Sequence, residues 1–437
     1  MTDMTYEESI KWLEMPDKRF RKADKEDFTL LMKTLGDPQD KLRFVHVTGS
    51  NGKGSVCTFL AEILQRSGYR TGLYTSPHLS VYNERCRIDG EDIPDEDLAR
   101  LASAVKCEAE KLELSLGLFY KMTALSFLYF AGQKCDIVVL EVGRGGRRDC
   151  TNIVTTTELA VIGSVSLEHT EVLGKTVREI AREKSGIFKP GADALMLYQS
   201  EEAMEVARMM ADSLGVRLCF TAPAELISEQ HGPEGQTLSY RLRKHVQLAC
   251  SGLYQTENVQ LVLDAADILR ERGFIIPEEA IRSALASLKF PGRFEILSRK
   301  PFFLIDGAHN IGAVSALTEG LRTYYPERRF TFVVTLLWDR PWQEMLRLTA
   351  PLAASFIAAG STDPKALSSE ETAVFIRDQL HLPAAAAADE NEALRIALDK
   401  AGRDGAVCVF GSLYLVGAIR DLYLSQKNGE CLNRQGI

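Results

Sequence analysis

Short apolar runs alternate with longer amphipathic segments along most of this 437-residue chain. Alternating apolar residues predict a short strand at 42–47. Apolar runs predict fully buried strands at 136–141 and 159–165, and further strands at 72–74, 302–305, 330–337, 353–358 and 406–410. Apolar residues recur at helical spacing in segments 6–12, 25–35, 53–66, 95–114, 120–131, 256–272, 311–324, 390–401 and 413–424. Segment 238–248 reads as a hairpin, and the alanine run 384–388 reads as a loop. This alternation predicts an α/β fold with doubly wound sheets, which bind ligands at the carboxyl ends of their strands.

A break rich in proline and glycine, near residues 291–295, separates two such α/β series. A chain of 437 residues is too long for one ordinary hydrophobic core, so more than one domain is expected. We therefore predict a P-loop doubly wound sheet domain over residues 1–295. A smaller Rossmann-like α/β domain is predicted over residues 296–437.

Composition excludes several classes of protein. The hydrophobic fraction of 45% and the charged fraction of 26% are those of a soluble globular protein. The net charge of −8 and the lack of a long Lys/Arg block argue against a nucleic-acid partner. The nine cysteines form no C-x-x-C pair, which favours a reducing compartment and buried thiols. The acidic N-terminal segment does not resemble a signal peptide, and no apolar run is long enough to span a membrane. We expect a cytoplasmic protein.

The most informative stretch is Gly49-Ser-Asn-Gly-Lys-Gly-Ser55, between a predicted strand and a predicted helix. A glycine-rich turn at a helix N-terminus presents backbone N–H groups to a phosphate. Lys53 would add charge for the outer phosphates, and Ser55 could face a phosphate or a metal ion. The usual P-loop pattern would have glycine in place of Val47 and Ser or Thr in place of Gly54. The stretch still predicts a nucleoside triphosphate site.

Other polar residues follow predicted strands. Glu141 leads into a glycine-dense loop, where its carboxylate could hold Mg²⁺ together with triphosphate oxygens or simply cap the turn. His169 taken alone is more often a structural histidine, and Lys184 taken alone reads as a solvated lysine near a helix C-terminus. Asp306 and His309 form a polar pair at a strand end, which is a common arrangement in clefts.

In their order along the chain, these motifs resemble those of the folylpolyglutamate synthase/dihydrofolate synthase family, within the Mur ligase superfamily. The segments that carry the resemblance are 48–55, 74–79, 83–90, 141–152, 167–191, 290–295, 304–310 and 409–415. The resemblance implies an ATP-dependent amide ligase that joins L-glutamate to a folate, to dihydropteroate, or to both, through an acyl phosphate. It implies a Mur-ligase-like ATP-binding domain at residues 1–295 and a C-terminal glutamate-ligase domain at residues 296–437.

The same resemblance implies a set of site residues. The residues that match contacts with ATP are Gly49, Ser50, Asn51, Gly52, Lys53, Gly54, Ser55, Asn258, Arg293, Asp306 and His309. The residues that match Mg²⁺ ligands are Ser76, Glu141 and His169. The residues that match the substrate region are Phe119, Tyr120, Lys121, Met122, Arg148, Asp149, Cys150 and Ser412. Lys184 matches a lysine that the family carries as a carbamate, and it joins Lys53 and His169 in the expected catalytic set.

Four positions depart from the family pattern. Lys121 stands where glutamate is usual, Glu168 replaces an aspartate, and Arg144 and Arg148 replace leucines. These departures bear on the identity of the acceptor more than on the chemistry of ATP. One hypothesis is that the basic loop favours an acceptor with extra carboxylates, such as a polyglutamate tail.

Two alternatives stay open at this point. A Mur-type ligase of cell-wall precursors would need an N-terminal UDP-binding domain, and only 41 residues precede the first strand of the P-loop domain. A nucleotide-binding module without catalysis is disfavoured by the intact set Lys53, Glu141, His169 and Lys184. The expected partners are small-molecule substrates, with no nucleic acid and no membrane, and the expected state is a monomer.

Overall fold

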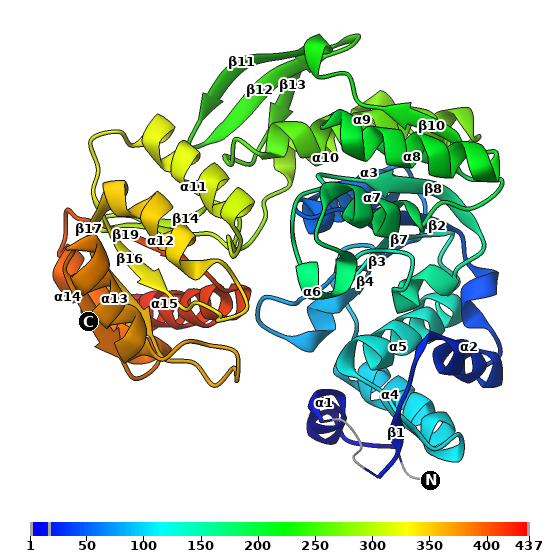
Figure 1. Cartoon of the computed structure of the whole chain (residues 1–437), viewed down its shortest axis with the longest axis horizontal. Helices are drawn as coiled ribbons and strands as arrows, with labels where there is room; N and C mark the ends of the chain where they lie inside the picture. Colours follow the sequence, from blue (N-terminus) through cyan, green and yellow to red (C-terminus); the bar gives the residue numbers. More distant parts are fainter. Residues whose placement is uncertain (1–2, 16–18, 435–437) are drawn as a thin grey trace. The chain divides into compact units, whose positions relative to one another are not determined.

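The computed structural model describes residues 3–15 and 19–434, which form two compact units (Figure 1). Unit 1 takes in Met1–Glu229, Thr237–Gln247 and Gln255–Leu288. Unit 2 takes in Gln230–Gln236, Leu248–Tyr254 and Lys289–Ile437. Each unit has its own central sheet, and each is described by itself below.

Unit 1 is built on an eight-stranded sheet of order β10-β9-β8-β2-β7-β3-β4-β5. Its strands are β2 (Phe44–Thr48), β3 (Thr71–Tyr74), β4 (Cys86–Ile88), β5 (Glu91–Asp92), β7 (Ile137–Glu141), β8 (Thr157–Ile162), β9 (Asp193–Met196) and β10 (Arg217–Phe220). The pairs from β10 to β3 are parallel, whereas β4 pairs antiparallel with β3 and with β5. Strand β2 lies in the middle, so its carboxyl end opens at the centre of the sheet edge.

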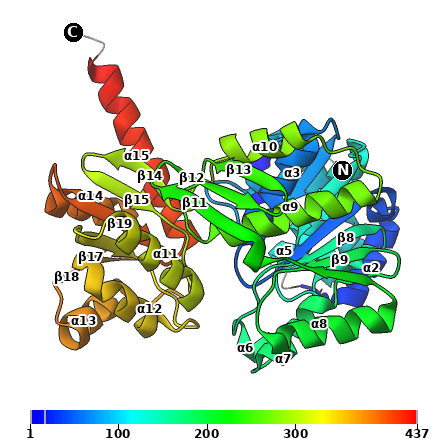
Figure 2. The ribbon, with the colours of Figure 1, turned by 90° about the horizontal axis from the view of Figure 1, so that it is seen from above.

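Helices cover both faces of this sheet. Its helices are α1 (Tyr6–Glu14), α2 (Lys25–Thr34), α3 (Lys53–Arg66), α4 (Asp95–Lys111), α5 (Leu118–Gly132), α6 (Thr170–Leu173), α7 (Val177–Ser185), α8 (Glu201–Leu214), α9 (Gln255–Glu271) and α10 (Glu278–Ser287). Helices α3 and α9 pack on one face, and the cores formed with α5 and with α7 and α8 lie on the other (Figure 2). Because both faces are buried, every residue of β2 and β7 is buried, and β7 reads as a continuous apolar run up to Glu141.

Unit 2 is built on a six-stranded sheet of order β14-β15-β19-β16-β17-β18. Its strands are β14 (Glu295–Arg299), β15 (Phe302–Ile305), β16 (Phe330–Val334), β17 (Ala353–Ala359), β18 (Ala384–Ala387) and β19 (Ala406–Phe410). Only the β14–β15 pair is antiparallel in this sheet.

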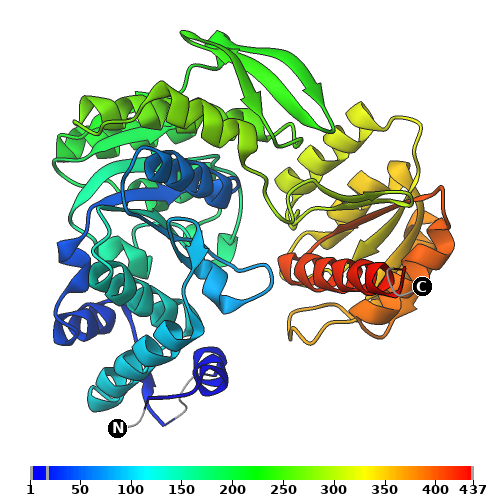
Figure 3. The same cartoon turned by 180° about the vertical axis from the view of Figure 1, so that it is seen from behind.

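Five helices cover the unit 2 sheet: α11 (Ile311–Tyr324), α12 (Trp342–Thr349), α13 (Ser369–Leu380), α14 (Glu390–Ala401) and α15 (Leu413–Arg434). Helices α11, α12 and α13 share an aromatic-rich core with Phe332 and Phe356. Helices α14 and α15 pack against the other face, where α15 follows directly from β19 (Figure 3).

Three-stranded and two-stranded sheets complete the fold. The first has the order β11-β12-β13, with β11 (Leu226–Gly232), β12 (Gly235–Tyr240) and β13 (Arg243–Leu248), and it contributes residues to both units. The second pairs β1 (Arg21–Lys22) with β6 (Leu114–Ser115). The predicted hairpin at 238–248 corresponds to β12 and β13, whereas β11 was missed because its side chains are mostly exposed and polar.

The predicted α/β class with parallel-rich sheets is confirmed. One local prediction was wrong: the alanine run 384–388 is not a loop, because Ala384–Ala387 form the edge strand β18 beside β17. Pro383 precedes the run and Asp389 is the N-cap of α14, so the run cannot extend either neighbouring helix. Its small side chains fit the edge of the sheet. The predicted helix 95–114 ends at Lys111, because Leu114 enters β6. Within the described part of the chain, no helix is both long and apolar enough to cross a membrane.

Candidate active site

The glycine-rich stretch forms a tight connection from β2 to α3, as predicted. Gly52 is the N-cap of α3 and has a φ of +81°. A Cβ on Gly52 would lie 2.1 Å from Oδ1 of Asn258, so both the conformation and the close approach require glycine. The first turn of α3 therefore presents its backbone N–H groups at the carboxyl edge of the sheet, which is where an anion is stabilised.

Hydrogen bonds hold this loop against the segment that follows β8. The Ser50 N–H donates to the carbonyl of Ser164 at 2.6 Å, and the Asn51 N–H donates to Oγ of Ser164 at 3.1 Å. The Ser166 N–H donates to Oγ of Ser50 at 3.0 Å. The same segment continues to Glu168 and His169, so the phosphate loop and these two side chains belong to one local structure.

Lys53 lies over the loop that it follows. Its Nζ donates to the carbonyl of Gly49 at 2.7 Å and to that of Ser50 at 3.5 Å. The lysine charge therefore adds to the positive end of the α3 dipole, which is the electrostatic arrangement that a triphosphate needs.

Two of the three predicted Mg²⁺ ligands lie together. Glu141 ends β7 and is 3% exposed, and its Oε2 accepts a hydrogen bond from the Ser76 N–H at 2.8 Å. A Cβ on Gly54 would lie 3.8 Å from each carboxylate oxygen, so the carboxylate faces the first turn of α3. His169 is the N-cap of α6, with a φ of +45°, on the loop after β8. Among the described residues, no group of three His, Cys, Asp or Glu side chains could hold a metal ion. The donors fit an ion bound mainly by phosphate, hydroxyl and water oxygens.

A buried ion pair stands beside the phosphate loop. Nζ of Lys184, on α7, donates to Oε1 of Glu168 at 2.7 Å, and the two side chains are 1% and 10% exposed. Burial alone would raise the pKa of Glu168, but the charges of Lys184 and Lys53 outweigh it and lower this pKa to about 2. Burial lowers the pKa of Lys184 to about 8, and Glu168 offsets only part of that effect. At neutral pH the pair is charged, with a larger neutral fraction of Lys184 than an exposed lysine has.

Gln255 is a buried polar residue of the candidate site that no sequence motif indicated. It begins α9, is 1% exposed, and donates from Nε2 to Oγ of Ser55 at 3.2 Å. Its Oε1 accepts a hydrogen bond from Nδ2 of Asn258 at 2.8 Å. Gln255 therefore links the predicted phosphate contact Ser55 to Asn258. No local pattern could have identified it, because Ser55 and Gln255 are 200 residues apart.

We expect Gln255→Leu to raise the KM for ATP and to lower the free energy of unfolding by about 1–3 kcal/mol, because it leaves buried polar atoms of Ser55 and Asn258 unpaired. Steady-state kinetics and chemical denaturation measure the two effects. Gln260→Leu is the matched control, since Gln260 is 2% exposed on the same helix and its Oε1 has no hydrogen-bond partner. An unchanged KM for ATP in Gln255→Leu would contradict this role.

The predicted acceptor residues lie on α5 and on the loop that follows β7. The Phe119 ring packs closely on Gly143, because a Cβ on Gly143 would lie 2.4 Å from Cζ of Phe119. Tyr120 packs edge-on against Phe28, with the ring centroids 5.0 Å apart, and Met122 is fully buried. Lys121 is 2% exposed, and its Nζ donates to the carbonyls of Trp12 and Met15, the latter at 2.8 Å. Lys121 therefore ties α5 to the end of α1.

The next three predicted acceptor residues differ in exposure. Arg148 is exposed, with its Nε 3.9 Å from Oε1 of Glu183. Asp149 is buried and accepts hydrogen bonds from the Arg144 N–H at 2.9 Å and from Oγ1 of Thr151 at 2.6 Å. Cys150 is buried and donates to Oγ1 of Thr123 at 3.4 Å. The Asp149 carboxylate therefore shapes the loop, and Arg148 is the exposed member of the three.

In unit 2, Asp306, His309 and Ser412 come together at the carboxyl ends of the neighbouring strands β15 and β19. The buried Asp306 accepts hydrogen bonds from the Phe294 N–H and the Ala308 N–H, each at 2.8 Å. Nδ1 of His309 lies 2.8 Å from the Gly307 carbonyl.

Two further contacts anchor this edge. The hydroxyl of Tyr254 donates to Oδ2 of Asp306 at 3.1 Å, and Tyr254 was not identified from the sequence. A Cβ on Gly307 would lie 2.1 Å from Nη1 of Arg293, so the guanidinium crosses directly over this glycine. Asp306 thus holds the turn across which Arg293 lies.

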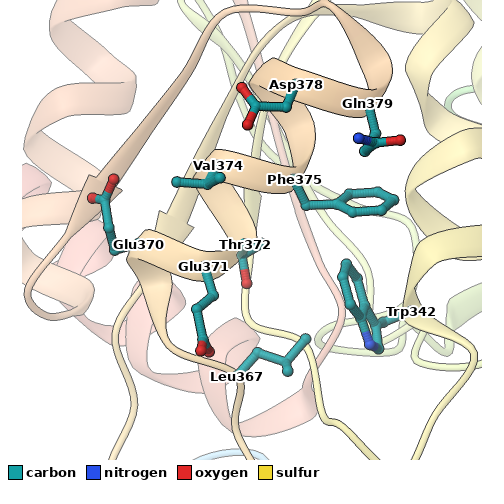
Figure 4. A pocket seen from close by; sticks show the side chains of 9 residues that line it. All are labelled: Trp342, Leu367, Glu370, Glu371, Thr372, Val374, Phe375, Asp378 and Gln379. Atoms are coloured by element: carbon teal, nitrogen blue, oxygen red, sulfur yellow. The ribbon is translucent and has the colours of Figure 1, made fainter.

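Unit 2 also has a groove between α12 and α13, away from these residues. It is lined by Trp342, Leu367, Glu370, Glu371, Thr372, Val374, Phe375, Asp378 and Gln379 (Figure 4). The Trp342 and Phe375 rings pack edge to face, with their centroids 4.7 Å apart. None of the predicted site residues lines this groove.

Comparisons with known proteins show which family this chain resembles over its length. Residues 47–263 match the Mur ligase middle domain, and residues 292–413 match the Mur ligase glutamate ligase domain. The dihydrofolate synthase/folylpolyglutamate synthase of Bacillus subtilis is 33% identical over 89% of this chain and 92% of its own. The folylpolyglutamate synthase of Lacticaseibacillus casei is 30% identical over 97% of this chain and 100% of its own.

Solved structures give the same result. The folylpolyglutamate synthase of Mycobacterium tuberculosis complexed with ADP superposes with a TM-score of 0.86, at 28% identity, over 96% of this chain and 98% of that one. The folylpolyglutamate synthase of Thermotoga maritima superposes with a TM-score of 0.82, at 30% identity, over 95% of this chain and 96% of that one. The chain therefore belongs to the folylpolyglutamate synthase/dihydrofolate synthase family of the Mur ligase superfamily, whose members are ATP-dependent amide-forming ligases.

Proposed function

We propose that this protein is an ATP-dependent ligase that joins L-glutamate to a folate, to dihydropteroate, or to both, through an acyl phosphate. The observation that carries the proposal is the convergence of the phosphate loop, the Glu141 carboxylate and the buried Lys184–Glu168 pair at one edge of the unit 1 sheet. The names of the relatives and the ADP-bound neighbour support the same reaction.

The reaction fits these groups because a carboxylate is a poor acyl donor. An oxygen of the acceptor carboxylate attacks the γ-phosphorus of ATP, ADP leaves, and an acyl phosphate forms. Lys53 and the N–H groups of the first turn of α3 stabilise the charge on the transferred phosphoryl group. The amino group of L-glutamate then attacks the acyl carbon, and phosphate leaves as the amide forms.

The proposed reaction includes a bound Mg²⁺ ion. Glu141, Ser76 and His169 would hold it, and the Glu141 carboxylate facing the first turn of α3 supports that role. When bound, the ion would neutralise phosphate charge during transfer. Arg293, Asp306, His309 and Asn258 are proposed to serve nucleotide or glutamate binding, as the family match implies, with Ser412 among the substrate contacts.

We also propose that Lys184 is carbamylated in the working enzyme. Only a neutral amine adds to CO₂, and burial of Lys184 raises its neutral fraction. A carbamate would place a negative charge beside Glu168, so the modified form would need a nearby cation. Carbamylation and Mg²⁺ binding are therefore expected to support each other.

The acceptor side of the proposal rests on Phe119, Tyr120, Lys121, Met122, Arg148, Asp149 and Cys150. We propose that Phe119 and Arg148 contact the acceptor, because the ring lies on the Gly143 loop and the guanidinium is exposed on it. The buried Lys121, Met122, Asp149 and Cys150 would instead shape this region. We propose that the enzyme works as a cytoplasmic monomer. The eight cysteines whose side chains the structure describes are free thiols, which supports a reducing compartment.

The test is product analysis with dihydropteroate, tetrahydrofolate, ATP, Mg²⁺ and L-glutamate. We expect ADP and phosphate to be released only when an acceptor and glutamate are both present, and mass spectrometry to show acceptors heavier by one glutamate or more. The two acceptors, tested separately, would reveal which of the two family activities is present. ATP hydrolysis without glutamate incorporation on either acceptor would contradict the proposal.

A further inference from the structure

The central strand β2 carries two polar side chains, His46 and Thr48, that are fully buried. Polar groups are costly to bury unless they form hydrogen bonds, so the partners of these two side chains indicate what the residues do. His46 and Thr48 are two residues apart on one strand, so both side chains extend from the same face of the sheet. The partners of both lie in the segment that follows β7, the strand next to β2.

Thr48 holds the middle of that segment. We call residues 142–149, which connect β7 to the short 3-10 helix η3 (Cys150–Ile153), the acceptor loop. The proposed acceptor contact Arg148 lies on this loop, and the other, Phe119, packs against its Gly143. Oγ1 of Thr48 donates a hydrogen bond to the carbonyl of Gly145 at 2.5 Å. One side chain of β2 therefore fixes the backbone of the acceptor loop directly.

His46 holds the end of the loop through a chain of hydrogen bonds. Oγ1 of Thr151, on η3, donates its proton to Oδ1 of Asp149 at 2.6 Å, so towards Nε2 of His46, 3.0 Å away, it can only accept. Burial lowers the pKa of His46 to about 3, so the ring is neutral and its one N–H is on Nε2. The Asp149 carboxylate in turn accepts the Arg144 N–H at 2.9 Å. The orientation of this carboxylate, and with it the shape of the loop, is thus tied to His46.

The same strand leads into the phosphate loop. Thr48 is the last residue of β2, and the glycine-rich connection to α3 begins at the next residue, Gly49. A strand in the middle of a sheet is among the most rigid parts of a fold. Phosphoryl transfer requires the acceptor carboxylate and the γ-phosphate to be held close together and aligned. The strand that ends in the phosphate loop therefore also sets the position of the loop proposed to bind the acceptor.

The phosphate loop has supports of its own. Its Ser50 and Asn51 N–H groups donate to the carbonyl and to Oγ of Ser164, after β8, at 2.6 and 3.1 Å. Neither bond involves the side chain of His46 or Thr48. Loss of these two side-chain bonds should therefore loosen the acceptor loop and leave the phosphate loop in place.

We propose that His46 and Thr48 are positioning residues that set the acceptor loop from the strand that ends in the phosphate loop. This inference rests on the proposed function and adds two residues that align the acceptor for it. Both act through other groups: Thr48 through the Gly145 carbonyl, and His46 through Thr151 and Asp149. Without these bonds the loop occupies its binding shape for a smaller fraction of the time, and the apparent affinity for the acceptor falls by that fraction.

The first test is Thr48→Val, which replaces the hydroxyl by a methyl group of similar size. The KM for the acceptor should rise about fivefold, the effect of one lost hydrogen bond. The KM for ATP and the kcat at saturating acceptor should change less than about twofold, because saturation restores the binding shape of the loop. Thr48→Ser keeps the hydroxyl and should return the acceptor KM towards the wild-type value.

His46→Phe should have the same effect, because it keeps a planar ring but loses the Nε2 donor. His46→Gln should restore the acceptor KM in part, since its amide N–H can reach the position of Nε2. Thr157→Val is the matched control: Thr157 is a buried threonine of the same sheet, on β8, and its Oγ1 has no hydrogen-bond partner among the described residues. An unchanged acceptor KM in Thr48→Val and His46→Phe, an equal rise of both KM values, or the same effect in Thr157→Val would overturn the inference.

A second measurement does not depend on turnover. Amide hydrogen exchange of the full chain should be about fivefold faster across residues 142–152 in Thr48→Val and His46→Phe, and unchanged in the first turn of α3. Exchange at the wild-type rate across residues 142–152 in both variants would overturn the inference. If the wild type added glutamate to neither acceptor while the two variants still showed faster exchange, the proposed function would fail and the positioning of the loop by β2 would stand.

Discussion

Lys53→Ala is expected to lower kcat for glutamate incorporation by about a thousandfold, with the midpoint of thermal unfolding unchanged within about 2 °C. The ammonium lies over the phosphate loop, where it donates hydrogen bonds to the carbonyls of Gly49 and Ser50, and Lys53 is only partly buried. Its loss removes positive charge where negative charge develops in phosphoryl transfer, without opening a cavity. Glutamate incorporation assays and thermal denaturation measure the two quantities.

Lys33→Ala, on an exposed face of α2, is the control for removing one lysine from unit 1, and it should leave both quantities at their wild-type values. Full turnover of Lys53→Ala at saturating ATP would refute the assignment of the phosphate loop. A large fall in thermal stability would instead assign Lys53 a structural role.

Lys184→Met is expected both to abolish glutamate incorporation and to lower the free energy of unfolding by about 3 kcal/mol. The stability loss arises because the Glu168 carboxylate, 10% exposed, keeps its charge in a buried place after its partner is removed. The activity loss arises because the proposed carbamate cannot form on methionine. Chemical denaturation and incorporation assays separate the two effects.

The double variant Glu168→Gln/Lys184→Met provides the control for stability. It removes both charges, so it should recover most of the lost stability and remain inactive. Carbon-13 NMR with labelled bicarbonate should show a carbamate resonance in the wild type that is missing in both variants. No recovery in the double variant would contradict the ion pair, and wild-type turnover by Lys184→Met would contradict its role in catalysis.

Much of the fold could be predicted because the signals that define it are local. Helices α3, α11 and α14 begin and end at the predicted residues or within one or two of them, since helical periodicity and capping act within a few residues. The prediction of a loop at the alanine run was wrong because alanine has no strong preference for a strand. The run forms a strand only through its pairing with β17 at the sheet edge.

Residues of the candidate site also fall into those that local sequence patterns predict and those that they do not. The glycine turn, Lys53 and Glu141 could be found from strand-end patterns and from the resemblance to a family. Gln255 and Tyr254 could not, because each acts through one hydrogen bond to a residue far away in the sequence. Their residue types are common at helix starts and in loops, so no pattern separates them from unremarkable neighbours.

The sequence by itself determined most of the strands and helices, the phosphate loop and the family, because these depend on residues near one another along the chain. Only the tertiary structure decided that Lys184 faces Glu168, that Lys121 is held by α1, and that Gln255 links Ser55 to Asn258. The physical reason is that ion pairing and desolvation depend on distance and burial in space. Neither quantity exists until distant segments have packed together.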